Sequence, residues 1–123
     1  MMRHILPMSD FIFKIFRVPE WETFTNNGAF TGSADDLRDG YIHLSAGGQL
    51  AGTLAKYFHG ETSLIIARFR ADTLSPLKWE ISRGGEKFPH LYAPLPISAL
   101  DTHLALRHKD GKFIVPTEFI GQS

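Results

Sequence analysis

Residues 82–95, with the sequence SRGGEKFPHLYAPL, constrain the fold of this chain more than any other segment. Proline fixes its own φ, restricts the residue before it and interrupts helices, so the Phe88-Pro89 step is rigid and non-helical. The adjacent glycines Gly84 and Gly85 form a flexible pivot, because glycine adopts left-handed conformations readily. We therefore predict a loop that holds charged and aromatic side chains in fixed places, as a ligand-binding loop does.

The length and charge of the chain limit the classes of protein to which it can belong. Its 123 residues fit a single domain, which we assign to residues 1–123. Thirteen basic and thirteen acidic residues cancel, which argues against broad binding to nucleic acid or to anionic membranes. The sequence has no cysteine, which excludes disulfides and thiolate zinc sites.

The hydrophobic pattern of the sequence indicates the cellular compartment in which we expect the protein. No apolar run reaches the ~20 residues of a membrane helix, and the start of the chain does not resemble a signal peptide. We expect a cytoplasmic protein that binds no membrane, while the sequence leaves its oligomeric state open.

Strand-like segments outnumber helical ones. Aromatic and β-branched residues between turn signals predict strands, at residues 11–17, 41–45, 63–69 and 77–81. Near the C-terminus, Asp110-Gly111 is typical of a two-residue hairpin turn and predicts a hairpin over about 102–116.

One main helix is predicted over residues 47–58, followed by a C-cap at Gly60. Its apolar residues recur at helical spacing, at Leu50, Leu54, Tyr57 and Phe58. Pro19 and the Ser33–Asp36 spacing indicate one or two shorter helices. The fold class is therefore α+β, with a mixed or antiparallel sheet and helices on one side.

Tyr41, His43 and Ser45 form the first candidate site. Alternate side chains of a strand share a face, so these three point together while Ile42 and Leu44 enter the core. A histidine beside hydroxyls could orient a ribose or phosphate oxygen, or act as an acid or base near neutral pH. The alternative is a solvated outer face, with Ser45 starting the next helix.

The strand at 77–81 offers a carboxylate. If Leu77, Trp79 and Ile81 point inward, Lys78 and Glu80 share the opposite face. A carboxylate such as Glu80 could stabilise a developing cation in glycosidic chemistry. The alternative is an ordinary surface lysine–glutamate pair, which contributes little energetically.

The 82–95 loop adds further candidates. Arg83 could bind a phosphate or carboxylate bidentately, and the N–H groups of Gly84 and Gly85 could form an anion-binding nest. His90 and Tyr92 face one way if the chain is extended after Pro89. The alternative is a stiff loop that only closes one end of the sheet. No metal-binding motif is present, so we predict no metal ligands.

Two motifs together resemble a known family. DGYIHLS at 39–45, a helix, and KWEISRGGEKFPHLYAPLP at 78–96 look like a small bacterial family of unknown function, DUF952, whose pattern resembles GSxxDxxDGFIHLS followed by RWExSRGGxxFPHLYGPLP. The resemblance covers about residues 11–97. Tyr41 stands where phenylalanine is common and Ala93 where glycine is common.

The resemblance implies a fold and a class of ligand. The family is grouped with the ADP-ribosyltransferase-like fold, a split β-sheet that clamps NAD in many members. That grouping implies a nucleotide-like small-molecule ligand, with NAD as a substrate and no established cofactor. It also implies roles, with His43 and Glu80 catalytic and a set of ligand-binding residues made up of Tyr41, Ser45, Arg83, Gly84, Gly85, His90 and Tyr92. A non-catalytic nucleotide- or anion-binding module and a structural or interaction domain remain the alternatives.

Overall fold

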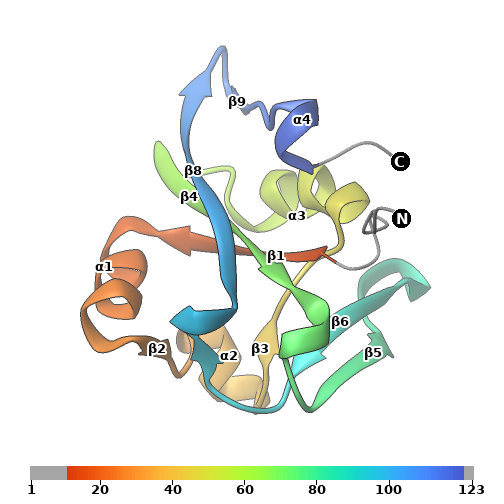
Figure 1. Cartoon of the computed structure of the whole chain (residues 1–123). Helices are drawn as coiled ribbons and strands as arrows, with labels where there is room; N and C mark the ends of the chain where they lie inside the picture. The colour runs from red at the N-terminus through yellow and green to blue at the C-terminus, as the bar shows by residue number, and fades with distance from the viewer. Residues whose placement is uncertain (1–10, 121–123) are drawn as a thin grey trace, which may run out of the picture.

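The structure is a computed structural model that describes residues 11–120, apart from the side chain of Arg83. It is an α+β fold with antiparallel strands and few helices (Figure 1). The strands are β1 (Phe11–Arg17), β2 (Ala29–Phe30), β3 (Ile42–His43), β4 (Ser63–Arg70), β5 (Leu77–Ile81), β6 (Lys87–Leu91), β7 (Leu95–Pro96), β8 (Leu100–Lys109) and β9 (Lys112–Phe113). The α-helices are α1 (Val18–Asn27), α2 (Ala34–Asp39), α3 (Leu50–Tyr57) and α4 (Thr117–Ile120).

The described strands form three antiparallel groups. A four-stranded sheet has the order β1-β4-β8-β9, a three-stranded sheet has the order β3-β6-β5, and β2 pairs with β7. The two larger sheets meet where Phe13 of β1 and Ser45, just after β3, exchange two backbone hydrogen bonds of 2.8 and 2.9 Å. This junction curls the strands around a common interior.

The four-stranded sheet has a hydrophobic cluster on each face. Strands β1 and β4 are therefore buried on both sides, which explains their nearly continuous apolar sequences FIFKIFR and SLIIARFR. Even-numbered Ile12 and Phe16 enter one cluster, whereas Phe13 and Ile15 enter the other. The second cluster lies between the sheet and the α3 and α4 region (Figure 1).

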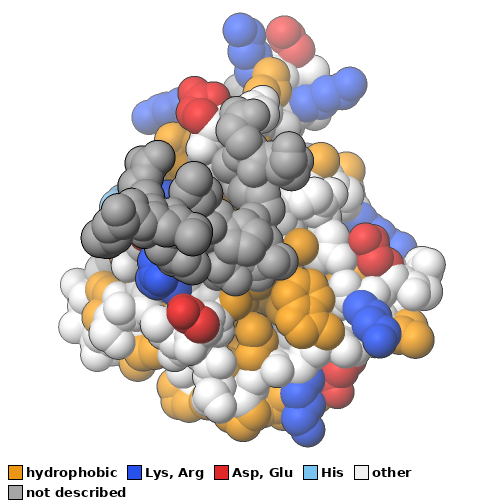
Figure 2. Space-filling view, turned by 45° about the vertical axis from the view of Figure 1, so that its right-hand side comes forward, with side chains coloured by type: hydrophobic (Ala, Val, Ile, Leu, Met, Phe, Trp, Pro, Cys, Tyr) orange, Lys and Arg blue, Asp and Glu red, His pale blue; other side chains and the backbone are white. Residues whose placement is uncertain are grey.

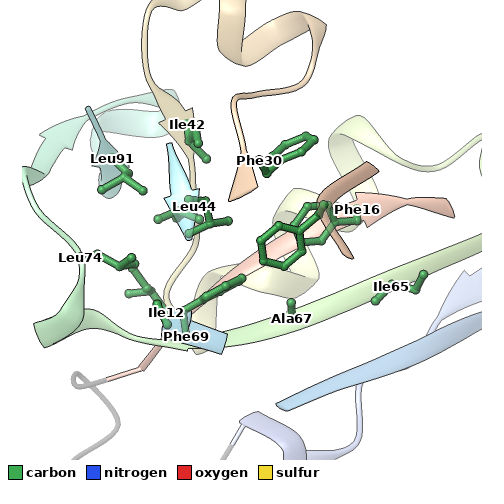
Figure 3. Close-up of a cluster of buried hydrophobic side chains, with 13 residues drawn as sticks. Ile12, Phe16, Phe30, Ile42, Leu44, Ile65, Ala67, Phe69, Leu74 and Leu91 are labelled. Carbon is green, nitrogen blue, oxygen red and sulfur yellow. The ribbon is translucent and has the colours of Figure 1, made fainter. Parts of the chain in front are cut away.

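The first cluster joins the two larger sheets. Figure 3 shows side chains of β1 and β4 meeting Ile42, Leu44 and Leu91 from the three-stranded sheet region. The alternation predicted for residues 41–45 therefore holds for Ile42 and Leu44, each 2% exposed. Burying such a side chain stabilises the fold by roughly 1.5–3 kcal/mol. Because Ile42 and Leu44 are buried, the opposite face of β3 points away from the core.

The helix ends follow local sequence signals with one exception. Helix α1 ends at Asn27 with Gly28, which has φ of 79°, as its C-cap, and Ser33 caps α2 through a capping box with Asp36. The predicted C-cap at Gly60 is wrong, because α3 ends at Tyr57 with Phe58 as its cap. The Phe58 side chain packs against the second cluster, so tertiary packing ends the helix before the glycine.

The predicted loop at residues 82–95 is only partly a loop. Residues Lys87–Leu91 form β6, the central strand of the three-stranded sheet. Pro89 is tolerated there because its carbonyl still accepts a 3.1 Å hydrogen bond from the Leu44 N–H, so the ladder lacks only the N–H that proline cannot supply. His90 is therefore carried on a strand, whereas Arg83 and Tyr92 lie outside it.

The predicted inward orientation of Trp79 and Ile81 is wrong. Their side chains are 42% and 69% exposed, and only Leu77 of this set packs against the core. Strand β5 is the edge of its sheet, and the described core does not extend over the end where these two residues lie. Alternation correctly separates the two faces of β5 but cannot show how far the core reaches.

Candidate functional site

One face of the three-stranded sheet carries most of the predicted site residues. The register places His43 of β3 opposite His90 of β6, and His90 opposite Lys78 of β5. Glu80 lies two positions after Lys78 on β5, so it shares the face of Lys78, and it pairs with Phe88 of β6. Aromatic contacts extend the face toward Tyr41 and Tyr92, whose ring centroids are 5.3 Å apart.

A cleft of about 210 Å³ lies beside this face, near the junction of the two larger sheets. Its lining comes from β1, α2, α3, β6 and the segment around β3. Its polar lining includes Lys14, Asp36, Asp39, Tyr41, His43, Ser45 and His90.

Asp36 anchors one wall of the cleft and is only 2% exposed. Its Oδ2 accepts hydrogen bonds from Lys14 Nζ at 2.9 Å and from the Ser33 N–H at 2.9 Å. Burial alone raises the pKa of Asp36, but the hydrogen bonds from His43, Lys14 and Ser33 outweigh it and hold that pKa well below its usual range. The carboxylate therefore stays charged and fixes the segment that leads into β3.

His43 is held between two carboxylates. Its Nδ1 lies 2.6 Å from Asp36 Oδ1, which also accepts the His43 backbone N–H at 3.0 Å. Its Nε2 lies 3.0 Å from Asp39 Oδ2. Both ring nitrogens therefore face carboxylate oxygens, and the imidazole is held rigidly at the cleft wall.

His90 is held differently, by one carboxylate and an aromatic stack. Its Nδ1 lies 2.7 Å from Glu80 Oε1, which also accepts the Tyr92 hydroxyl at 2.7 Å. The Tyr41 ring stacks on the imidazole with centroids 4.0 Å apart and planes 24° apart. The Nε2 atom of His90 is buried and has no hydrogen-bond partner among the described residues.

Burial and charge within this network shift three further pKa values, those of Glu80, Tyr92 and Tyr41. The hydrogen bond from Tyr92, and then that from His90, lower the pKa of Glu80. The same Tyr92–Glu80 bond raises the pKa of Tyr92 to about 12, because the phenolate would face the carboxylate. Burial, with Asp39 and Glu80 nearby, also raises the pKa of Tyr41. At neutral pH the two tyrosines are therefore hydroxyl donors.

Ser45 also lines the cleft. It is 5% exposed, and its Oγ lies 3.4 Å from Thr53 Oγ1 on α3. The hydroxyl is thus oriented from the helix side, while the Ser45 backbone bonds to Phe13. The structure brings Tyr41, His43 and Ser45 to one wall, as the alternation along residues 41–45 predicts.

Four of the remaining predicted residues, Glu80, Gly84, Gly85 and Tyr92, do not line the cleft. Glu80 and Tyr92 belong to the same network as His90 but do not line the cleft, and they contact it through that histidine. Gly84 and Gly85 lie in the turn between β5 and β6, where the Gly85 N–H donates to the Ser82 carbonyl at 3.2 Å. This bond leaves the predicted anion nest without one of its two donors. The side chain of Arg83 lies outside the described part of the chain.

Three residues of the site were not predicted as site residues. They are Lys14, Asp36 and Asp39, which together fix His43. The sequence could have indicated a role for Lys14. It is a lone lysine inside the apolar run FIFKIFR, and a buried charge needs a partner if both faces of that strand are buried. The pairing with Asp36 spans 22 positions and depends on the sheet curl, which no local pattern gives.

Residues 11–120 contain neither a metal-binding cluster nor a membrane-spanning helix. No three histidine or acidic side chains in this range are grouped as ligands for a metal ion. None of its helices is long and apolar enough to cross a membrane. Figure 2 shows basic and acidic side chains interspersed on the face it presents, with no broad basic area there.

These features define a small α+β protein with curled antiparallel sheets, two hydrophobic core clusters and a polar cleft. The chain belongs to the family described as protein of unknown function, DUF952, which matches residues 15–102. No curated protein matches the chain.

Solved structures of one bacterial protein resemble this chain. The X-ray structure of protein CC0527 from Caulobacter crescentus is 45% identical, with a TM-score of 0.80 over 85% of this chain and 93% of that one. The solution NMR structure of the same protein is 44% identical, with a TM-score of 0.75 over 85% and 90% of the two chains.

Proposed function

We propose that this chain binds a nucleotide of the NAD or ADP-ribose type in the cleft and acts as a transferase or hydrolase at the glycosidic bond of its ribose. The observation that carries the proposal is one polar wall, formed by Tyr41, His43 and Ser45 with His90 across the strand pair. Hydroxyl and imidazole groups fixed side by side are suited to orient a sugar ring.

The size of the cleft favours the ribose end of such a ligand. Sites for drug-sized ligands span roughly 300–1,000 Å³, whereas this cleft is about 210 Å³. It suits one sugar and part of a base, with the rest of a dinucleotide outside it. The junction of two antiparallel sheets beside the cleft supports the proposed ADP-ribosyltransferase-like architecture, and a cytoplasmic location is part of the same proposal.

A non-catalytic binding module is the second candidate, and a specific observation favours it. The two groups proposed as catalytic are both engaged, since His43 faces Asp36 and Asp39 and Glu80 accepts from His90 and Tyr92. A purely structural domain fits less well, because it predicts scattered histidines and the rings of His43 and His90 are 5.7 Å apart.

Binding and turnover separate these candidates. Purified protein is titrated with NAD and with ADP-ribose by calorimetry, and NAD samples with and without added acceptors are monitored for nicotinamide release. Ligand at 100 times its dissociation constant should add about 2.7 kcal/mol to the stability measured by thermal denaturation. Turnover that is lost in a folded His43→Ala variant supports the enzyme, and binding without turnover supports the module. The absence of both ligand binding and NAD turnover would overturn the proposal.

A further inference from the structure

The Nε2 atom of His90 is an unusual feature of the cleft. The residue is 2% exposed, it lines the cleft, and Nε2 has no hydrogen-bond partner among the described residues. A buried polar atom without a hydrogen-bond partner destabilises the folded protein. A group in the cleft that bonds to this nitrogen would remove that cost.

The contact with Glu80 determines what that partner must be. An ionised carboxylate only accepts hydrogen bonds, and the pKa of Glu80 lies below its usual value. The hydrogen of the 2.7 Å contact therefore sits on His90 Nδ1. In the neutral ring the second nitrogen, Nε2, then holds a lone pair and accepts a hydrogen bond.

The charges around the cleft argue against a phosphate at this position. Each described cation in the lining is paired, Lys14 with Asp36, Arg17 with Glu20 and Glu61, and Arg38 with Asp35 and Asp39. A phosphate beside His90 would meet carboxylates and an acceptor nitrogen. An uncharged hydrogen-bond donor fits both features.

We propose that Nε2 of His90 accepts the hydrogen bond, and then the proton, of a ligand hydroxyl bound in the cleft, with Glu80 and Tyr92 as its positioning residues. Glu80 fixes the tautomer, and Tyr92 fixes Glu80 through the second bond to the same oxygen. The stacked Tyr41 ring holds the imidazole plane. Only the identity of the ligand rests on the proposed function.

With an N-ribosyl substrate the step is a substitution at the anomeric carbon. The hydroxyl oxygen bonds to that carbon while its proton moves to Nε2 of His90. The C–N bond breaks, and its electron pair stays on the nicotinamide nitrogen, which becomes neutral. The hydroxyl belongs to water in a hydrolase and to an acceptor in a transferase.

The tautomer is tested first, in the free protein. Long-range ¹H–¹⁵N NMR is expected to show the neutral His90 ring protonated at Nδ1, with assignment from the signals that disappear in His90→Asn. The Glu80→Gln variant should lose this single tautomer, because its amide can donate to Nδ1 as well as accept from it. A wild-type ring protonated at Nε2 would overturn the proposal.

Small hydroxyl probes then test the acceptor without assuming a nucleotide. D-ribose is expected to shift the Nε2 resonance of His90, whereas inorganic phosphate is not. An Nε2 resonance that ignores saturating D-ribose, or that responds equally to phosphate, contradicts the inference. A response to D-ribose without any binding of NAD or ADP-ribose would leave the inference standing and sink the proposed function.

Variants complete the test. His90→Asn retains an amide near the Nδ1 position and removes the Nε2 acceptor, so it should lower affinity for D-ribose at least 10-fold and any turnover at least about 100-fold. His59→Asn, an exposed histidine outside the cleft lining, is the matched control and should change neither. If ADP-ribose binds His90→Asn as tightly as wild type, the inference fails although the proposed function survives.

Discussion

The Lys14 Nζ atom lies 2.9 Å from Oδ2 of Asp36, and neither side chain is more than 6% exposed. The same ammonium donates to the His43 carbonyl at 3.0 Å. One buried cation thus connects β1, α2 and β3, and it lies beneath the wall that carries His43. The geometry of the cleft depends on this pair more than on any surface ion pair.

Removing the cation should be costly. Lys14→Met leaves the buried Asp36 carboxylate without its lysine partner, and breaking such a pair typically costs about 3–5 kcal/mol. Urea denaturation at pH 7 measures the change in the free energy of unfolding. Arg70→Gln is the control, because it breaks the exposed 3.8 Å contact with Asp72 and should cost less than about 1 kcal/mol. Equal effects of the two substitutions would contradict the role given to Lys14.

Acid should destabilise the protein through Asp36. Its folded-state pKa lies below the unfolded value, so its contribution is complete above the unfolded pKa of about 3.9 and declines as pH falls toward the folded pKa. Urea denaturation between pH 7 and pH 3 should show this loss in the wild type. Asp36→Asn should be less stable at pH 7 and should have a flatter pH dependence; parallel curves would refute the assignment.

The phenol of Tyr92 should report the charge of Glu80. Tyr92 has a pKa of about 12, and Glu80→Gln should lower it toward the ordinary value of about 10. An NMR pH titration of the tyrosine rings measures the change. Glu86→Gln removes the same charge in the neighbouring turn and should leave the pKa of Tyr92 unchanged. Because the folded-state value is raised, the stabilisation from this group is present below about pH 10 and is lost as pH rises toward 12.

The glycines of the β5–β6 turn should matter for stability. Gly84 and Gly85 have φ of 66° and 77°, a region in which an L-residue with a side chain costs about 1–2 kcal/mol. Gly84→Ala and Gly85→Ala should each lower the unfolding free energy by about that amount. Gly52→Ala, inside α3 with open space around it, should instead stabilise the protein by up to about 1 kcal/mol. If Gly85→Ala left the free energy of unfolding unchanged, the turn would have relaxed to accept the side chain, and the prediction would be wrong.

Local sequence patterns predicted several of the strands and the orientation of the residues around His43. Strands 11–17 and 77–81 coincide with β1 and β5, since turn residues bound them clearly. The alternation at residues 41–45 depends only on strand periodicity, so it correctly turned His43 away from the core. The class α+β followed from the same local signals.

Long-range relationships were not predictable in the same way. The strand character of residues 87–91 was masked by Pro89, whose tolerance depends on its neighbour β3. The exposure of Trp79 depends on β5 being an edge strand, and the partnership of Lys14 with Asp36 depends on the curl of the sheets. Each requires knowledge of which strands pair, and single-strand periodicity does not contain it.

The central claim is that the cleft binds the ribose end of a nucleotide, and an NMR titration with ADP-ribose tests it most directly. Amide and ring signals of Tyr41, His43, Ser45 and His90 should shift together and saturate with one dissociation constant, while those of the β8–β9 hairpin stay unchanged. Absence of any shift at these four residues up to millimolar ADP-ribose, or shifts confined to other surfaces, would contradict the account.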